Sequence, residues 1–299
     1  MYITITGSLG HIGKPLTRQL VEKGHMVTVI SSNPDKQSAI EALGAHAAIG
    51  SLSDVDFLTA TLTGADAVYT MVPPNYNVPD MRAYYGQLGH NYVEAIGRTG
   101  VKRVVNLSSY GADLAEGTGI ILGAHDVEKM LNGLPDVAIT HLRPTYFYYN
   151  LYAFVEMIRR VGFIGANYGG DDRLVMVAPV DIAAVAAEEL EKPAVQQGVV
   201  SNDVRYIVSD EHTGNEIART LGAAIGKPDL SWVVFTDEQS RNGMEQNGMP
   251  ASIAADFVDL GASIHSGAMR QDYDRHTPAI MGNVKLHEFA KEFAAMFNA

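Results

Sequence analysis

The sequence predicts an α/β fold in which a parallel sheet carries helices on both faces. Three observations support this prediction. Short runs of β-branched and apolar residues recur along the first half of the chain, segments with helical periodicity separate them, and the first run leads directly into a glycine-rich turn. Strands that are buried on both faces of a parallel sheet read as continuous apolar runs, and helices connect them.

The first predicted strand, residues 2–6, is followed by Gly7, Gly10 and Gly13. We expect Gly7 to let the chain turn sharply and Gly13 to let the next helix pack close to the strand. Without side chains at Gly7 and Gly10, a pyrophosphate can approach the backbone and the free amides of the helix. A helix and a strand over residues 26–30 complete a βαβ unit, which favours a dinucleotide site over an ordinary turn. The predicted cofactor-binding residues of this turn are Gly7, Ser8, Leu9, Gly10, His11, Ile12 and Gly13.

The alternation of strands and helices continues along the chain. Further strands are predicted over residues 45–49, 65–72, 101–107 and 137–142, and helices over residues 55–62, 79–99, 120–131 and 147–161. Thr213 and Glu216 form a capping box for a later helix. Residues 261–282 have no clear periodicity, and we expect a long loop there.

The alternation predicts a doubly wound parallel sheet of the Rossmann type over residues 1–145. Residues 146–299 are expected to form a smaller α+β domain, with some segments returning to the sheet. No repeat or low-complexity segment is present.

Composition excludes several classes of protein. The chain has 299 residues, 46% of them hydrophobic, and a net charge of -12, so it offers no basic surface for nucleic acid. It has no cysteine, which excludes disulfides and thiolate metal sites. No apolar run is long enough to span a membrane and no basic segment precedes the first strand, so we expect a cytoplasmic protein.

In such a fold, residues at the end of the second strand contact the adenosine ribose. An acidic residue there is typical of NAD binding, but this chain has Ser31, Ser32 and Asn33. Their donors, with Lys36, favour NADP(H) over NAD(H), although no arginine is present to bind the 2′-phosphate. Ser32 and Asn33 are equally typical of a helix N-cap that binds no ligand.

Ligands of doubly wound sheets bind at the carboxyl ends of the strands. The cofactor is therefore expected to contact residues that follow the fourth and fifth strands, namely Met71, Val72, Pro73, Ser108 and Ser109. Tyr76, Tyr110, Tyr146 and Asn150 are candidates for binding a flat aromatic substrate. Packing is the alternative role for these aromatic side chains.

Several motifs occur in one order along the first 190 residues. They are residues 7–13, Asn-Pro-Asp-Lys at 33–36, Ser-Ser at 108–109, the segment 125–131, Leu-Arg-Pro at 142–144 with the aromatic run that follows, and Val-Asp-Ile-Ala at 180–183. In this combination the chain resembles the NmrA-like group of atypical short-chain dehydrogenases/reductases. The resemblance implies a Rossmann domain that binds NADP or NAD, and a smaller domain that closes over a cleft. Members of the group are quinone and isoflavone-type reductases, or redox sensors that bind cofactor without turnover.

The chain departs from active short-chain dehydrogenases at the catalytic pair. Those enzymes use a tyrosine and a lysine four residues later, whereas no tyrosine here has lysine at that spacing. Aligning Glu128 with the glutamate that follows this lysine in the family places Ile120 and Ala124 at the two positions. His125 is a candidate proton donor instead, and a partly exposed histidine without catalytic role is the alternative. Asp181 is expected to cap its helix.

The ten histidines form no metal-binding pair and no nucleophile motif is present, so neither a metal site nor a hydrolase is expected. The leading hypothesis is an NAD(P)H-dependent reductase that transfers hydride directly to a quinone-like or conjugated carbonyl acceptor. The alternative is a redox-sensing protein that binds the cofactor without turnover. A sugar-nucleotide epimerase is a third possibility, which the missing tyrosine disfavours. The sequence does not decide the oligomeric state.

Overall fold

The computed structural model describes residues 1–194 and 200–299. The chain divides into two compact units, which are described separately. Unit 1 comprises residues 1–112, 123–143 and 182–205, and unit 2 comprises residues 113–122, 144–181 and 206–299. The chain therefore leaves unit 1 after Arg143 and returns to it once more at Ile182.

Unit 1 is built on a sheet with the strand order β10-β6-β5-β4-β1-β2-β3 in the described part of the chain. Its strands are β1 (Tyr2–Ile5), β2 (Met26–Ser31), β3 (His46–Ile49), β4 (Ala67–Thr70), β5 (Arg103–Leu107), β6 (Ala138–Pro144) and β10 (Asn202–Ile207). The register of neighbours from β3 to β6 is parallel. The amide of Ile139 donates to the carbonyl of Ser201 at 3.0 Å at the edge toward β10.

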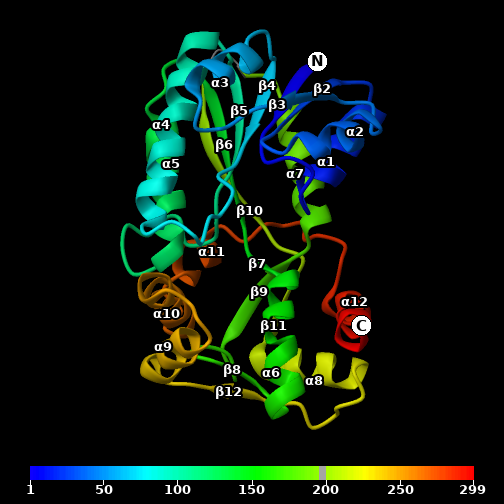
Figure 1. Ribbon diagram of the computed structural model, residues 1–299, viewed down its shortest axis with the longest axis vertical. Coiled ribbons are helices and arrows are strands. Elements are labelled where there is room, and N and C mark those ends of the chain that lie inside the picture. The colour runs from blue at the N-terminus through cyan, green and yellow to red at the C-terminus, as the bar shows by residue number, and fades with distance from the viewer. Residues whose placement is uncertain (195–199) are drawn as a thin grey trace. The chain divides into compact units, whose positions relative to one another are not determined.

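The strand order reverses between β1 and β4, which is the switch point where doubly wound sheets bind ligands. The predicted fold class is therefore confirmed. Helices cover the sheet on both faces (Figure 1). The helices are α1 (Gly13–Glu22), η1 (Pro34–Lys36), α2 (Gln37–Glu41), α3 (Val55–Leu62), α4 (Met81–Thr99), α5 (Leu122–Asn132) and α7 (Pro179–Leu190).

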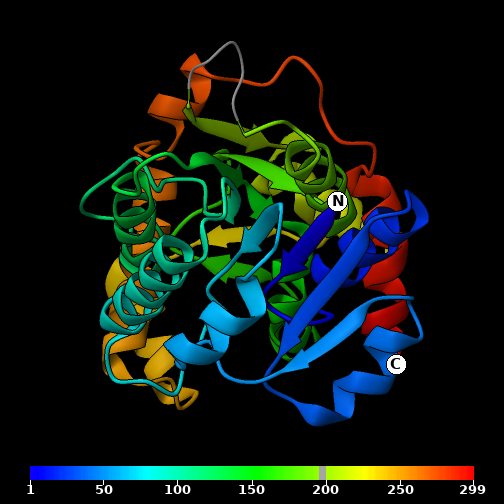
Figure 2. The ribbon, with the colours of Figure 1, turned by 90° about the horizontal axis from the view of Figure 1, so that it is seen from above.

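Helices α3, α4 and α5 pack on one face of the sheet, and Figure 2 shows α4 and α5 together on the same side of the strands. The core on this face joins Leu58 of α3, Tyr92 of α4 and Val127 of α5 to Val68 and Val104 of the strands. All five side chains are at most 2% exposed. This core fixes the helices over the strands whose ends form the candidate site.

Unit 2 contains two small sheets, of order β11-β9-β7 and β12-β8, among its described residues. The strands are β7 (Tyr146–Phe147), β8 (Ile164–Ala166), β9 (Arg173–Val177), β11 (Asp210–Thr213) and β12 (Trp232–Val234). The helices are η2 (Gly119–Ile121), η3 (Tyr148–Phe154), α6 (Val155–Val161), α8 (Gly214–Ala224), α9 (Asp237–Gln246), α10 (Ala251–His265), α11 (Arg270–Arg275) and α12 (Leu286–Asn298). The core of unit 2 includes Tyr148, Trp232, Phe289 and Phe293.

Two predictions about unit 2 are wrong in detail. The helix expected over residues 147–161 is α-helical only in α6, because β7 and the 3-10 helix η3 occupy its first part. Residues 261–282 are not a continuous loop, because α10 extends to His265 and α11 follows. Tyr273 of α11 is 1% exposed, so tertiary packing stabilises a helix that the sequence pattern does not reveal. The predicted capping box of Thr213 and Glu216 is confirmed.

Candidate functional site

The turn between β1 and α1 has the geometry that a phosphate-binding loop needs. Gly7 has a φ of +88° and Ser8 a φ of +60°, so two successive residues are left-handed. A Cβ on Gly7 would lie 2.5 Å from Sδ of Met71, the residue that follows β4. The positive φ therefore favours glycine at position 7, and a side chain there would also displace the flexible side chain of Met71.

Gly13 and Gly10 differ in what surrounds them. A Cβ on Gly13 would lie 2.1 Å from the carbonyl oxygen of Ser8, so the start of α1 is pressed against the turn. A Cβ on Gly10 would meet nothing nearer than the carbonyl oxygen of Gly7, at 3.9 Å. Gly10 is also exposed, and the fold itself leaves room there. The free space beside Gly10 is what the close approach of a pyrophosphate requires.

The first turn of α1 has no side-chain cap. Ile12 occupies the N-cap position, and no hydrogen bond from a side chain satisfies the first amides of the helix. The amide of Lys14 bonds to the carbonyl of Gly10 at 3.1 Å, and the Lys14 side chain is exposed in this turn. The Leu16 amide bonds to the carbonyl of Ile12 and Pro15 has no amide hydrogen, so the partial positive charge of the helix N-terminus and the exposed Lys14 side chain are what favour a phosphate here. Lys14 follows the glycine pattern directly and was missed from the sequence.

Ser31 connects the turn to the end of β2. Its hydroxyl accepts a hydrogen bond from Ser8 Oγ at 3.0 Å and from the amide of Asn33 at 3.2 Å. Ser31 is 3% exposed, so its hydroxyl is part of the framework of the loop. Asn33 caps η1 by accepting from the amide of Asp35 at 2.9 Å. Ser32 and Lys36 are exposed and are the donors that remain at this strand end.

Met71 is held in place by the strands beside it. Its amide donates to Thr6 Oγ1 at 2.9 Å, and its carbonyl accepts from the hydroxyl of Tyr92 at 2.6 Å. Burial raises the pKa of Tyr92 above its usual range, so the hydroxyl stays a donor. Val72 is 7% exposed and Pro73 is partly exposed. These contacts position the Met71 thioether over Gly7.

Ser108, at the end of β5, is bound to a buried ion pair. Its hydroxyl donates to Glu128 Oε1 of α5 at 2.5 Å, and the two carboxylate oxygens accept from Arg143 of β6 at 2.9 and 2.7 Å. The side chains of Arg143 and Glu128 are 8% and 7% exposed. The pair therefore fixes the Ser108 hydroxyl as a donor and leaves its lone pairs to accept from a ligand. Both residues lie within the sequence motifs, although no role was predicted for them. Ser109 is partly exposed next to Ser108.

His125 is 7% exposed, and its Nδ1 bonds to the carbonyl oxygen of Ala112 at 2.8 Å. Because a carbonyl only accepts, Nδ1 carries the proton and ties α5 to the segment after β5. The expected partial exposure of His125 is therefore wrong, while its role as a proton donor stays a prediction. At the positions of the missing catalytic pair, Ile120 is partly exposed and Ala124 is 9% exposed.

The predicted substrate residues differ in exposure. Tyr76 of unit 1 is 46% exposed and Tyr110 is 9% exposed. In unit 2, Asn150 is exposed, and the partly exposed Tyr146 bonds through its hydroxyl to that of Tyr168 at 3.1 Å. Tyr168 was missed from the sequence because no motif surrounds it.

Asp181 does not cap its helix as predicted. Its carboxylate accepts from Ser209 Oγ at 2.7 Å and from the amides of Asn283 and Val284 at 3.0 and 3.2 Å. A Cβ on Gly282 would lie 2.3 Å from Asp181 Oδ2, so the backbone passes directly over the carboxylate. Asp181 therefore fastens the segment before α12 within unit 2.

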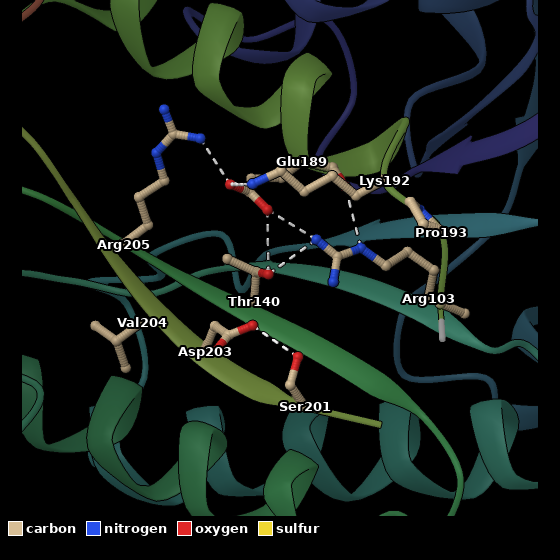
Figure 3. A pocket seen from close by; sticks show the side chains of 10 residues that line it. Arg103, Thr140, Glu189, Lys192, Pro193, Ser201, Asp203, Val204 and Arg205 are labelled. Atoms are coloured by element: carbon tan, nitrogen blue, oxygen red, sulfur yellow. Dashed lines mark hydrogen bonds and ion pairs between the residues drawn. The ribbon is translucent and has the colours of Figure 1, made fainter. Parts of the chain in front are cut away.

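A polar hollow of about 310 Å³ lies in unit 1 at the amino ends of β5, β6 and β10, away from the strand ends that carry the candidate site. Figure 3 shows Arg103 and Arg205 directed at the carboxylate of Glu189. Arg103 and Arg205 donate to Glu189 at 2.8 and 2.6 Å, and Lys192 also pairs with it at 2.6 Å. Glu188 also pairs with Arg205 at 3.0 Å and with Lys192 at 4.0 Å. Because two carboxylates share these cations, we interpret the hollow as a structural ion network.

The described residues hold no group of three or more His, Asp or Glu side chains placed for a metal ion. Among the described helices, none is both long and apolar enough to cross a membrane.

Comparisons with known proteins agree with this geometry. Residues 7–148 match a family described as NAD(P)H-binding. The NAD(P)H azoreductase of Xenophilus azovorans is 29% identical over 303 residues, covering 99% of each chain. This similarity extends over both units.

Solved structures share the fold. The NADPH-dependent quinone oxidoreductase of Escherichia coli, complexed with NADPH, has a TM-score of 0.81 at 21% identity, covering 97% of this chain and 99% of that chain. The triphenylmethane reductase of Citrobacter sp. has a TM-score of 0.80 at 20% identity, covering 99% and 100%. Residues 7–148 are thus similar to an NAD(P)H-binding family, and the whole chain shares the fold of these reductases, which agrees with the predicted resemblance to the NmrA-like group of atypical short-chain dehydrogenases/reductases.

Proposed function

We propose that the protein is an NAD(P)H-dependent reductase of quinone-like or other conjugated aromatic acceptors. The observation that carries the proposal is the loop from Gly7 to Gly13, where the fold favours glycine at both ends and leaves free space at Gly10. That space is matched to a pyrophosphate at the N-terminus of α1. The named activities of the similar proteins, reduction of azo compounds, quinones and triphenylmethane dyes, support the choice of acceptor.

We propose the turn residues from Gly7 to Gly13 as the pyrophosphate site, with Met71, Val72 and Pro73 beside it. Ser108 and Ser109 would bind the nicotinamide end. The Ser108 proton is committed to Glu128, so Ser108 offers an acceptor to the carboxamide NH₂. At the adenosine end, Ser32 and Lys36 are exposed and no carboxylate precedes them, which supports NADPH as the preferred cofactor.

When bound, the reduced nicotinamide supplies a hydride, which is two electrons and one proton. The residues of this chain bind and orient the two reactants, and proximity provides the rate enhancement. In this proposal solvent supplies the second proton, because no tyrosine of the chain has a lysine four residues later. Acceptors that gain a hydride readily, such as quinones, need no strong acid at the site.

The test is the oxidation of NADPH and of NADH by the full chain with a panel of benzoquinones, naphthoquinones, azo dyes and triarylmethane dyes. We expect turnover with at least one class, and faster turnover with NADPH. Absence of turnover with every class would contradict the proposal.

A cofactor-binding redox sensor is the second candidate, and the missing catalytic pair favours it. It predicts tight binding of the cofactor in calorimetry without acceptor-dependent oxidation. The same panel therefore separates the two functions.

A further inference from the structure

Ser8, in the turn between β1 and α1, has an unusual backbone conformation. Its φ is +60°, and Asp136 is the only other non-glycine residue with a positive φ in the described part of the chain. A serine in this left-handed region is strained, because its Cβ crowds the backbone. Such strain persists only where the surrounding structure fixes the residue, and it is concentrated at functional sites.

Three contacts within unit 1 fix Ser8. Its amide donates to the carbonyl of Ile30 at 3.0 Å. Its hydroxyl donates to Oγ of Ser31 at 3.0 Å. Its carbonyl oxygen lies against α1, 2.1 Å from where a Cβ of Gly13 would lie. Two of the three contacts come from the last two residues of β2, so the end of this strand determines the conformation of the turn.

The hydroxyl of Ser31 is fully used by the protein. It accepts from Ser8 Oγ and from the amide of Asn33 at 3.2 Å, and its own proton is directed at the Asn33 carbonyl at 3.3 Å. A hydroxyl has one donor and two acceptor lone pairs, so none remains for a ligand. The backbone of Ser31 is also fixed, because its carbonyl accepts from the amide of Gly50 at 3.0 Å. Ser31 is 3% exposed and can act on a ligand only through its neighbours.

The two amides that follow Ser8 have no protein partner. In the part of the chain that the structure describes, the amides of Leu9 and Gly10 donate to no other group. Leu9 is partly exposed and Gly10 is exposed. Because the peptide between Ser8 and Leu9 is planar, rotation at Ser8 would turn the Leu9 amide with it. The conformation of Ser8 therefore sets the direction of amides that can form a concave site for an anion.

We propose that Ser31 is a positioning residue for the dinucleotide. It holds Ser8 in the strained conformation that presents the Leu9 and Gly10 amides to the pyrophosphate. Because the same hydroxyl binds Asn33, it also joins this turn to the strand end that is expected to contact the adenosine ribose. One buried hydroxyl thereby serves two parts of the cofactor site. The inference rests on the cofactor site of the proposed function, but not on turnover.

The proposal makes cofactor affinity depend on a hydrogen bond that the cofactor does not touch. Without the Ser31 hydroxyl, Ser8 is expected to relax toward a negative φ and to turn the Leu9 amide away. The apparent Kd then rises in proportion to the loss of the binding-competent turn.

The first experiment measures the Kd for NADPH and NADH by calorimetry in Ser31→Ala, Ser8→Ala and the double variant. Each single variant should raise the Kd for NADPH about three- to tenfold, as for loss of one hydrogen bond. The double variant should be no worse than the more affected single variant, because both substitutions remove the same bond. Ser8→Ala should weaken NADPH and NADH by the same factor, since both contain the pyrophosphate.

Thr140→Val is the matched control for loss of a buried hydroxyl. Thr140 is 2% exposed in unit 1, and its hydroxyl contacts Arg103 and Glu189 away from the cofactor site. Its Kd for NADPH should equal that of the natural protein. Circular dichroism verifies that each variant is folded. Ser8 is only partly buried, so Ser8→Ala keeps the test valid if Ser31→Ala does not fold.

The second experiment asks whether glycine at position 8 rescues the loss. Glycine adopts a positive φ without strain, so it does not need the Ser31 hydroxyl to hold it. Ser8→Gly combined with Ser31→Ala should therefore bind NADPH about threefold or more tightly than Ser8→Ala combined with Ser31→Ala. A general structural role of Ser31 would not be rescued at position 8.

Three results would overturn the inference. They are an unchanged Kd in both single variants, a glycine variant that binds no more tightly than the alanine double variant, and an equal loss of affinity in Thr140→Val. Turnover is judged separately, because calorimetry needs no acceptor. A protein that binds NADPH with these ratios but reduces no acceptor would retain the inference and lose the reductase function. An active reductase with an unchanged Kd in both single variants would do the reverse.

Discussion

The carbonyl oxygen of Ser8 lies where a side chain of Gly13 would begin. A Cβ on Gly13 would come within 2.1 Å of that oxygen, and the backbone that carries each atom is fixed by the turn and by α1. Gly13→Ala is therefore expected to lower the free energy of unfolding by about 1–3 kcal/mol or more, as overpacking does. Urea unfolding followed by circular dichroism measures it. An unchanged midpoint would show that the turn yields easily.

Gly10→Ala is expected to weaken cofactor binding and to leave the stability of the fold nearly unchanged. Its methyl group meets no protein atom nearer than 3.9 Å, so the free energy of unfolding should change by no more than about 0.5 kcal/mol. The methyl group would instead enter the space expected for the pyrophosphate, and the Kd for NADPH should rise by about tenfold or more. Calorimetry measures the affinity. Full affinity in this variant would argue against a phosphate beside Gly10.

Ser32→Arg tests the position of the 2′-phosphate. Ser32 is exposed at the end of β2, where a guanidinium would make charge-assisted hydrogen bonds to a phosphate. Affinity for NADP should increase by about tenfold while affinity for NAD stays the same. Ser38→Arg places an equal charge on the exposed surface of α2 and is the control. Equal gains in both variants would indicate a general effect of charge.

Glu128→Gln is expected to destabilise unit 1 by about 3–5 kcal/mol, because it leaves the Arg143 guanidinium buried without its counter-charge. Asp126→Asn is a matched control on the same helix. Asp126 pairs with Arg82 at 2.6 Å, but the side chains are 25% and 49% exposed, so about 1 kcal/mol or less is expected. Chemical unfolding compares the two variants. Equal losses of unfolding free energy would show that breaking the buried Glu128–Arg143 pair costs no more than breaking the exposed Asp126–Arg82 pair.

The burial of His141 predicts how the stability of the protein depends on pH. Burial lowers its pKa, and the neutral ring accepts from Asn106 at 3.2 Å and donates to Asn132 at 3.0 Å. The unfolded chain binds a proton near the ordinary pKa of about 6.5, whereas the folded protein resists protonation. This stabilisation is complete above about pH 6.5 and decreases as the pH falls below it.

The check is the slope of unfolding free energy against pH between about 5 and 6.5. His141→Gln should reduce this slope, whereas the exposed His46→Gln should keep it. If both variants retain the same slope as the natural protein, His141 does not cause it.

Much of unit 1 was predictable because local pattern and tertiary structure agree there. The strand over residues 2–6, the three glycines and the strand over residues 26–30 each have the composition that their final conformation requires. The fold class limits the strand order, since helical connections and right-handed crossovers leave few arrangements. The pattern carries less information in unit 2. β11 reads Asp-Glu-His-Thr, a polar stretch that becomes a strand only through antiparallel pairing with β9.

The sequence predicted which residues lie near each strand end of the candidate site, but not the contacts that their side chains make. Sequence position placed Met71 and Ser31 at the right edge, but not the Met71 thioether over Gly7 or the Ser31 hydroxyl bonded to Ser8. Those contacts depend on how neighbouring strands align. The same holds for Tyr168, whose partner Tyr146 lies 22 residues earlier in the chain.

The room left at Gly10 also separates two kinds of constraint on this family of sequences. The fold favours glycine at positions 7 and 13, whereas only a ligand would favour it at position 10. A relative that keeps the outer two glycines but has a bulky residue at the middle position should fold normally and have lost its cofactor. The residue at position 10 should therefore distinguish relatives that still bind a dinucleotide from relatives that use the same fold for another function.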